Sequence, residues 1–266
     1  MSDSKRFSGK VAVVTGAAGN IGLATALRLA REGARIALMD VDEGKLAATL
    51  PKFEALDAEA RTYPFDVTDP GAVSRAIGEV VQAFGGIDLL FNNAGYQGAF
   101  TPIQDYPEDD FERVLKINLC GAFYVLKACA RQMMTQGGGA IVNTASMAGI
   151  GGPPNMLGYA SSKFGIVGLT QTASKDLAPH KIRVNAISPG LMGPGFMWDR
   201  QVELQAKAGS QYFSSDPKEV AQQMIGSVPM RRYGDIEEIP GVVSFLLSDD
   251  ASYLTGVNIP ISGGIL

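Results

Sequence analysis

The chain has 266 residues, of which 46% are hydrophobic and 19% are charged. This composition is ordinary for a soluble globular protein, and the length suits one large core. A formal net charge of -4 gives no electrostatic reason to expect nucleic acid or an anionic membrane as a partner. The sequence has no run of 18 apolar residues, the length that a membrane-spanning helix needs, and residues 1–7 hold no apolar segment of signal-peptide length. We therefore expect a cytoplasmic protein.

The metal-ligating and thiol residues are few. Cys120 and Cys129 lie nine residues apart in one expected helix, so they are badly placed for a disulfide and too few for a zinc site. His180 is the only histidine and follows Ala178-Pro179 in an expected helix-end turn, where a surface residue is typical. We therefore expect reduced thiols and no metal.

A short apolar run at 11–14 leads through glycines into a helical pattern at 21–31. Its β-branched residues indicate a buried parallel strand, and the spacing after it indicates a helix. Gly16 allows a tight turn, Gly19 lets the backbone approach a ligand, and Gly22 allows close helix-strand packing. The exposed amides at the helix start attract a diphosphate. The alternative is a glycine-rich turn without a ligand.

The next expected strand, 35–39, ends in Asp40, 18 residues beyond Gly22. The dinucleotide-binding pattern has an acidic residue at about this distance, which accepts hydrogen bonds from the adenosine ribose hydroxyls. A carboxylate there repels a 2′-phosphate, and no arginine stands beside it to bind one. The sequence therefore predicts NAD rather than NADP; a turn aspartate is the alternative.

The rest of the chain alternates expected strands and helices with short links, which is typical of a doubly wound, Rossmann-type parallel sheet. We expect one domain over 1–266, about seven strands, and helices on both faces. Pro51 should divide the helical stretch 42–60 into two pieces. A third strand is expected over 61–65, and Asp66 after it could cap the helix over 72–84.

Asparagines follow the fourth expected strand, 87–91, in the run Asn92-Asn-Ala-Gly95. Ligands bind at the carboxyl ends of strands in open parallel sheets, and amide side chains there can hold neighbouring strands while the backbone passes beneath a cofactor. A plain turn would look similar. One long amphipathic helix is expected over Phe111–Gln136, and its Asn118 can satisfy buried backbone groups.

A strand over 140–143 ends at Thr144-Ala-Ser146, and Tyr159 and Lys163 stand at the start of the next helix. Spacing of four puts these two side chains on one helix face, within reach of one bound molecule. A nearby ammonium favours the phenolate and moves the tyrosine pKa toward neutral pH. The pair alone is commonly a surface feature, but its place after the preceding motifs favours catalysis.

These motifs resemble the classical short-chain dehydrogenase/reductase family over about residues 8–264. The resemblance implies a catalytic tetrad of Asn118, Ser146, Tyr159 and Lys163. Tyr159 would exchange the alcohol proton, Ser146 would bind the substrate oxygen, and Lys163 would hold the nicotinamide ribose and depress the tyrosine pKa. Asn118 would hold a water in the proton relay.

The resemblance also implies the cofactor contacts, and it assigns Asp66 to the adenine edge, so two roles stay open for that residue. The implied contacts are Gly16, Asn20, Ile21, Gly22, Asp40, Asp66, Val67, Asn93, Ala94, Gly95, Tyr159, Lys163, Pro189, Gly190 and Met192. Pro194 stands where the family usually has a threonine that holds the nicotinamide carboxamide. Proline offers neither hydroxyl nor N–H, so backbone near Ile187 or Met192 is expected to replace it.

Residues 193–230 depart from the alternation and include two helical runs, about 198–208 and 217–225. Two added helices at the carboxyl edge suit a substrate lid hinged at Gly193 and Gly195. A packing extension or a subunit contact is the alternative. Family members usually form tetramers, which implies a homotetramer paired through helices near 110–136 and 157–178.

The loops at 93–100, 143–156 and 190–198 surround the expected pocket and resemble those of the NAD-dependent xylitol dehydrogenases of acetic acid bacteria. Their neutral side chains suit a polyol's hydroxyls, and no arginine or lysine among them offers a carboxylate clamp. The candidate substrate contacts are Gln97, Asn143, Ser146, Asn155, Tyr159 and Trp198. We expect a polyol dehydrogenase converting xylitol to D-xylulose. The alternatives are a carbonyl or 3-oxoacyl reductase and a non-catalytic dinucleotide sensor.

Overall fold

The computed structural model describes residues 5–265, so the ends of the predicted domain and most of segment 1–7 lie outside the described part. Seven parallel strands form one sheet in the order β3-β2-β1-β4-β5-β6-β9. They are β1 (Val11–Thr15), β2 (Arg35–Asp40), β3 (Ala60–Pro64), β4 (Leu89–Asn92), β5 (Gly139–Thr144), β6 (Ile182–Pro189) and β9 (Asn258–Ile261). The strand order reverses between β1 and β4, and open sheets bind ligands at the carboxyl ends there. The predicted doubly wound sheet is confirmed.

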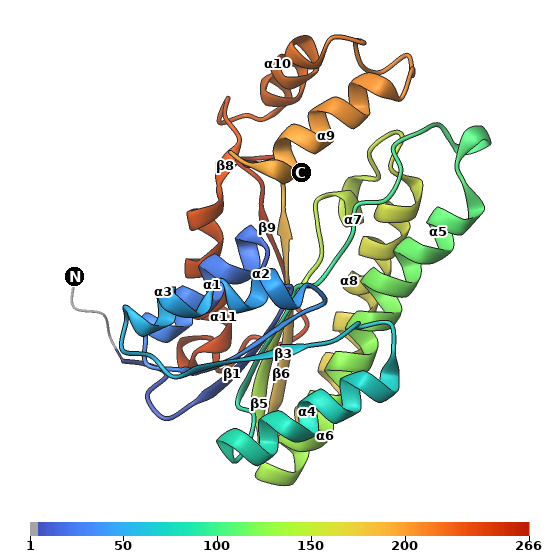
Figure 1. Ribbon diagram of the computed structural model, residues 1–266. Coiled ribbons are helices and arrows are strands. Elements are labelled where there is room, and N and C mark those ends of the chain that lie inside the picture. Colours follow the sequence, from blue (N-terminus) through green and yellow to red (C-terminus); the bar gives the residue numbers. More distant parts are fainter. Residues whose placement is uncertain (1–4, 266) are drawn as a thin grey trace.

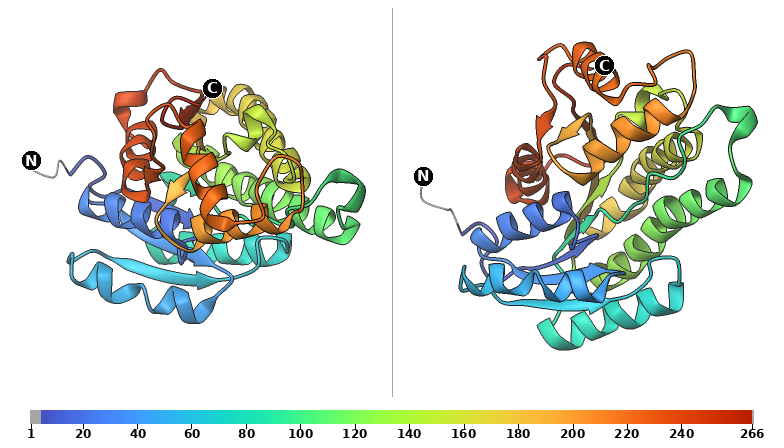
Figure 2. Two further views of the ribbon diagram at one scale, coloured as in Figure 1. Left: turned by 90° about the horizontal axis from the view of Figure 1, so that it is seen from above. Right: turned by 45° about the horizontal axis from the view of Figure 1, so that its top comes forward.

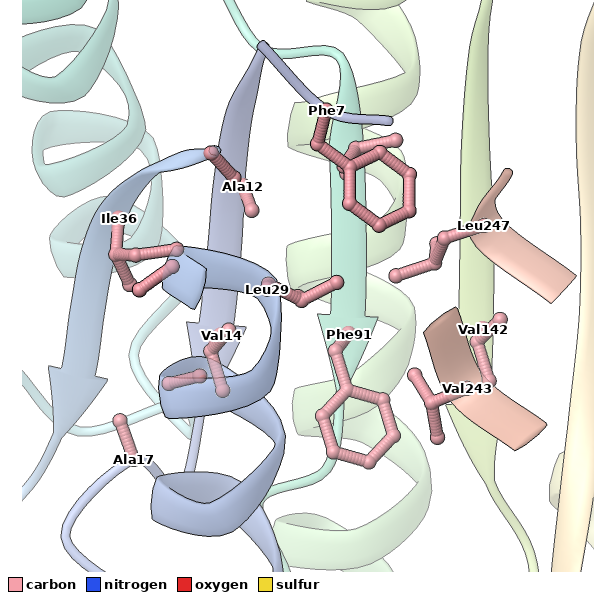
Figure 3. Packing of buried hydrophobic residues seen from close by; sticks show 14 of the residues in the cluster. Phe7, Ala12, Val14, Ala17, Leu29, Ile36, Phe91, Val142, Val243 and Leu247 are labelled. Atoms are coloured by element: carbon pink, nitrogen blue, oxygen red, sulfur yellow. The ribbon is translucent and has the colours of Figure 1, made fainter. Parts of the chain in front are cut away.

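Helices cover both faces of this sheet (Figure 1). One face carries α1 (Asn20–Arg31) and α11 (Ile239–Leu247), and the other carries α4 (Pro70–Phe84), α6 (Ala122–Gln136) and α8 (Leu157–Leu177). Within β1, Val14 packs toward α1 and Val13 toward α4, and both are fully buried. Figure 3 shows the first of these cores, where Leu29 of α1 and Val243 of α11 meet Phe91 of β4. Burial on both sides explains the nearly continuous apolar sequence of the strands.

Two short helices form in the stretch 42–60, as predicted: α2 (Glu43–Ala47) and α3 (Leu50–Glu54). Pro51 stands in the first turn of α3, where its missing N–H leaves no hydrogen bond unmade. It therefore starts the second helix rather than ending the first.

Of the two roles left open for Asp66, capping of the next helix is wrong. Asp69 is the N-cap of α4, and its carboxylate accepts hydrogen bonds from the N–H groups of Gly71 and Ala72. The Asp66 carboxylate instead accepts a local bond from the Thr68 N–H, at 2.8 Å.

The single helix expected over 111–136 is interrupted. α5 (Glu108–Leu115) passes into a π-helical segment, Lys116–Gly121, before α6 begins. π-Helical segments are rare in proteins overall, and those that occur are often found at functional sites. This one contains Asn118, whose side chain is buried with 1% of its surface exposed.

A separate helical layer stands above the carboxyl edge of the sheet (Figure 2). Two short parallel strands, β7 (Met192–Gly193) and β8 (Gly234–Asp235), pair at its base, and α9 (Phe196–Lys207) and α10 (Pro217–Ser227) lie between them in the chain. α9 and α10 pack on each other through Trp198, Val202, Val220 and Met224. We call residues 193–230 the helical layer below.

Within residues 5–265, no helix is both long and apolar enough to cross a membrane. The same residues contain no group of three or more His, Cys, Asp or Glu side chains that could hold a metal ion. Cys120 and Cys129 are both free thiols.

Candidate active site

The glycine turn joins β1 to α1 at very close range. Gly16 adopts a φ of +64°, and an ideal Cβ on Gly22 would lie 2.1 Å from the Gly16 carbonyl oxygen. Only glycine therefore fits at Gly22. The N-cap of α1 is Gly19, which has no side chain to accept from the first N–H groups of the helix. These uncapped amides suit an anion such as a diphosphate.

Threonine and asparagine side chains tie together the carboxyl ends of β1, β4 and β5. Thr15 Oγ1 accepts from the backbone N–H groups of Asn93 (2.8 Å) and Ala94 (3.0 Å). Thr144 Oγ1 donates to Asn93 Oδ1 at 3.1 Å. The Asn93–Gly95 backbone is thereby held flat against the glycine turn, and an ideal Cβ on Gly16 would lie 3.1 Å from the Ala94 Cα.

Two adjoining cavities run along this edge. One, of about 640 Å³, is lined by Asp40, Asp66, Val67 and Ala94, and the next, of about 240 Å³, by Asn20, Ile21, Tyr159 and Lys163. Gly16, Asp40 and Gly95 line both, so the space is elongated and continuous. The Asp40 carboxylate accepts from the Ala18 N–H (3.1 Å) and the Asp42 N–H (3.2 Å), which fixes its position at the rim. These residues fit a dinucleotide whose adenosine end lies near Asp40 and Asp66 and whose nicotinamide end lies near Tyr159.

Tyr159, Lys163 and Ser146 meet at the far end of this space. The Ser146 hydroxyl lies near enough to the Tyr159 phenol to lower its pKa. Lys163 Nζ lies 5.5 Å from the centre of the Tyr159 ring and donates to the Thr144 carbonyl at 2.7 Å. The predicted spacing thus brings a phenol, an ammonium and a hydroxyl together.

The pKa of Tyr159 does not follow the expectation that Lys163 lowers it. Burial raises the pKa of the Tyr159 phenol, and the Ser146 hydroxyl lowers it less strongly. The expected lowering by Lys163 is not found in this structure, where burial is the largest influence. Burial lowers the pKa of Lys163 to about 8, because its ammonium lies away from water with only a neutral carbonyl as partner.

Asn118 connects the π-helical segment to two parts of the site. Its Oδ1 accepts from the Tyr96 N–H at 2.7 Å, and its Nδ2 donates to the Tyr96 carbonyl and to Ser162 Oγ, each at 2.9 Å. The Ser162 hydroxyl in turn donates to the Tyr159 carbonyl at 2.7 Å. Both amide hydrogens are therefore used, and only one lone pair of Oδ1 is left for a water.

A third cavity, of about 410 Å³, opens from Ser146 and Tyr159 toward the helical layer. Pro189, Gly190 and Met192 form one wall, and none of the described residues that line the cavity has a charged side chain. The polar side chains of its lining carry hydroxyls and carboxamides, and its apolar side chains include five methionines. The carboxamide and methionine residues are Gln97, Gln201, Gln205, Gln223, Met147, Met156, Met192, Met197 and Met224.

Three predicted substrate contacts lie outside this cavity. Asn143 is fully buried; its side chain accepts from Asn92 of β4 and donates to Thr170 of α8. Asn155 is also buried, and its Nδ2 donates to Gln205 Oε1 (2.8 Å) and Ser210 Oγ (2.9 Å) of the helical layer. Trp198 packs on Tyr233 at 5.2 Å between ring centres and borders only the cavity at Tyr159 and Lys163. The Asn143 and Asn155 side chains are thus engaged in bonds within the protein, whereas Trp198 faces the cavity at Tyr159 and Lys163.

Sequence reasoning missed Thr15, Arg200 and Gln201. The threonine directly precedes Gly16, so its place at the end of β1 was a usable signal. The other two lie on α9, where no local pattern tells which side chains face the sheet edge.

Comparisons with known proteins agree with this geometry. The sequence profile described as short chain dehydrogenase matches residues 10–204. A crystal structure of NAD+-bound xylitol dehydrogenase is 68% identical, with a TM-score of 0.96, covering 97% of this chain and 99% of that one. Levodione reductase of Leifsonia aquatica is 41% identical over 99% of this chain and 96% of its own length. 3-Oxoacyl-[acyl-carrier-protein] reductase FabG of Thermotoga maritima is 36% identical over 98% and 99%.

The family resemblance and the predicted NAD cofactor are thus confirmed at the level of the family and its NAD-bound relative. The match extends over most of the chain and includes the glycine turn, the asparagine loop and the Tyr159–Lys163 pair. The chain belongs to the short-chain dehydrogenase family of oxidoreductases.

Proposed function

We propose that this protein is an NAD-dependent dehydrogenase that interconverts a neutral polyol and a ketose, with xylitol and D-xylulose as the best pair. One observation carries the proposal: Ser146 and Tyr159 open onto a cavity that is lined by carboxamides and hydroxyls and, among residues 5–265, by no charged side chain. A carboxylate or phosphate substrate would find no cation there, whereas hydroxyl groups find both donors and acceptors. The 68% identical xylitol dehydrogenase supports the choice of substrate.

The residues of the site would divide the work as follows. Bound NAD supplies the hydride acceptor. Asp40 and the α1 amides would hold its ribose and diphosphate, and Lys163 would hold the nicotinamide ribose. Tyr159 would remove the proton of the substrate hydroxyl as general base, while the Ser146 hydroxyl orients the same oxygen. Asn118 would position a water through its remaining lone pair.

The Tyr159 pKa must fall for this chemistry at neutral pH, since burial alone raises it. The protonated Lys163 ammonium, 5.5 Å from the ring centre, and the positive charge that the oxidised cofactor brings both favour the phenolate. We therefore assign the activation of Tyr159 to the complex with cofactor rather than to the tyrosine and lysine alone.

Residues 193–230 would act as the substrate lid. Met197, Gln201 and Met224 of its two helices line the uncharged cavity, so its position determines access. An ideal Cβ on Gly195 would lie 3.0 Å from Asn20 Nδ2, which places the start of the lid beside the glycine turn. Pro194 borders the cavity at Tyr159, and backbone of residues 187–192 would bind the carboxamide.

A second candidate is the reduction of neutral ketones. The methionine-rich wall of the cavity accommodates apolar rings, and levodione reductase is 41% identical. A 3-oxoacyl thioester is the third substrate class to test, since FabG is also similar.

One assay separates these candidates. The protein is incubated with xylitol, sorbitol, ribitol, cyclohexanol or cyclohexanone, and an acetoacetyl thioester, each with both nicotinamide cofactors, while the absorbance of the reduced nicotinamide is followed. We expect the highest kcat/KM with xylitol and NAD, and no turnover by Tyr159→Phe. Preference for the cyclic substrates or the thioester would overturn the polyol assignment.

We also propose a homotetramer. Phe123 of α6 and Leu157 and Phe164 of α8 are exposed apolar side chains on the helices that the family resemblance pairs across a two-fold axis. Sedimentation velocity should give the mass of four chains, and Phe164→Glu should lower it.

A further inference from the structure

Gln97 is the carboxamide that lies between the catalytic end and the lid. It is buried, with 7% of its surface exposed, and it lines both the cavity at Tyr159 and Lys163 and the uncharged cavity. A carboxamide can present either a donor or an acceptor to a substrate. Which of the two Gln97 presents depends on what holds its other end.

Arg200 of α9 holds that end. Its Nη1 donates to Gln97 Oε1 and its Nη2 to the Gly98 carbonyl, each at 3.3 Å. Its guanidinium also lies 5.9 Å from the centre of the Tyr96 ring, and the hydroxyl of that tyrosine donates a hydrogen bond to Asp110 Oδ1. The arginine makes no ion pair with a carboxylate among residues 5–265. Its contacts are therefore with residues 96–98 and not with a carboxylate.

A guanidinium has only donors, so it can meet only the oxygen of the Gln97 amide. The Nε2 group must then point away from Arg200; no hydrogen bond from it to residues 5–265 is found, and it is not among their buried unpaired atoms, so it is accessible from the cavities that Gln97 lines. Gln201, the next residue of α9, also lines the uncharged cavity. Helix α9 of the lid thus contributes Arg200, which fixes the Gln97 amide, and Gln201, whose own amide lines the same cavity.

We propose that Arg200 is a positioning residue for substrate selection: it fixes the Gln97 amide so that Nε2 donates to a hydroxyl oxygen of the polyol other than the one oxidised. The inference rests on the proposed polyol dehydrogenase function. It predicts that affinity for a polyol depends on the contact between the lid and the 96–98 loop, whereas proton transfer at Tyr159 does not.

The test is steady-state kinetics with xylitol and saturating NAD for Gln97→Met, Arg200→Met, Arg200→Lys and the double variant Gln97→Met/Arg200→Met. Lys207→Met is the matched control, because Lys207 is a cationic α9 residue whose side chain is 74% exposed and forms an ion pair with Glu203, one turn away on the same helix. A single lost hydrogen bond predicts a KM for xylitol raised about 2- to 10-fold in each methionine variant, with kcat within about twofold of wild type. Arg200→Lys keeps the positive charge but not the planar guanidinium, so its KM for xylitol should lie between those of wild type and Arg200→Met.

The double variant decides between positioning and general damage. If Arg200 acts through Gln97, the KM of the double variant equals that of Gln97→Met, whereas two independent effects multiply. Gln97→Glu gives a second check, since its carboxylate keeps the Arg200 contact but replaces the Nε2 donor with an acceptor, and its KM should rise with an unchanged melting temperature. An unchanged KM in Gln97→Met or Gln97→Glu, or multiplying effects, would overturn the proposal. Failure of the wild type to oxidise any polyol would instead refute the function on which it rests.

Discussion

Asn118→Ala tests whether this side chain is mainly a structural tie. The substitution removes three hydrogen bonds at a position with 1% exposure and leaves the Tyr96 N–H and the Tyr96 carbonyl without these partners, while the Ser162 hydroxyl loses one donor but still donates to the Tyr159 carbonyl. Each buried polar group that loses its partner costs about 1–3 kcal/mol. For these two groups, we expect the free energy of unfolding to fall by about 2–6 kcal/mol.

Differential scanning calorimetry measures this directly. For a domain of this size, 1 kcal/mol lowers the melting temperature by about 2–4 °C, so Asn118→Ala should melt roughly 4–24 °C below wild type. Ser162→Ala, which removes only one partner of the amide, should show a smaller decrease. Gln171→Ala on the exposed side of α8 is the control and should not change the melting temperature.

The opposite result has a clear meaning. If Asn118 serves only to hold a relay water, Asn118→Ala melts within about 2 °C of wild type and loses kcat alone. That outcome would refute the structural account of the π-helical segment.

Three further predictions follow from the cofactor site and the lid. Asp40→Ala removes a charge that opposes a 2′-phosphate by about 1–4 kcal/mol at contact distance, so the ratio of NAD to NADP in kcat/KM should fall at least about fivefold; an unchanged ratio would contradict this role. Burial lowers the Lys163 pKa to about 8, so the unfolded chain binds more protons above that pH, and the stability contribution of Lys163 rises from pH 8 to 10.5. Urea unfolding without cofactor should show wild type gaining about 3 kcal/mol relative to Lys163→Met over that window, and a constant difference would disprove the burial argument. Asn155→Gly keeps the positive φ of 67° but removes the bonds to Gln205 and Ser210, so limited proteolysis at 208–216 should speed up severalfold; equal rates would show that the tie is unimportant.

The sequence predicted most securely what local geometry dictates. Gly22 can be nothing else because its Cβ would meet the Gly16 carbonyl, and this requirement is visible as a motif. Asp40 and Tyr159 follow from strand ends and helix spacing, which alternation and periodicity reveal. The seven-stranded sheet was predictable for the same reason.

What depends on register and docking was not predictable. Asn93 and Asn143 both stand at strand ends, but Asn143 pairs across β4 and β5 with Asn92 and never reaches the cavity. Asn155 looked like a pocket residue because its neighbours are, yet its side chain turns to the lid. Arg200 acquires its role only because α9 docks over the 96–98 loop, and no local pattern contains that contact.

The central claim is that Tyr159, Ser146 and Lys163 surround the reacting end of NAD and a polyol. A crystal structure of Tyr159→Phe with NAD and xylitol tests it most directly, because the variant should bind both without turnover. The account predicts the nicotinamide ring beside residue 159, its ribose hydroxyls on Lys163, and one xylitol hydroxyl within hydrogen-bond distance of Ser146. A nicotinamide ring bound elsewhere, or xylitol out of reach of Ser146, would contradict it.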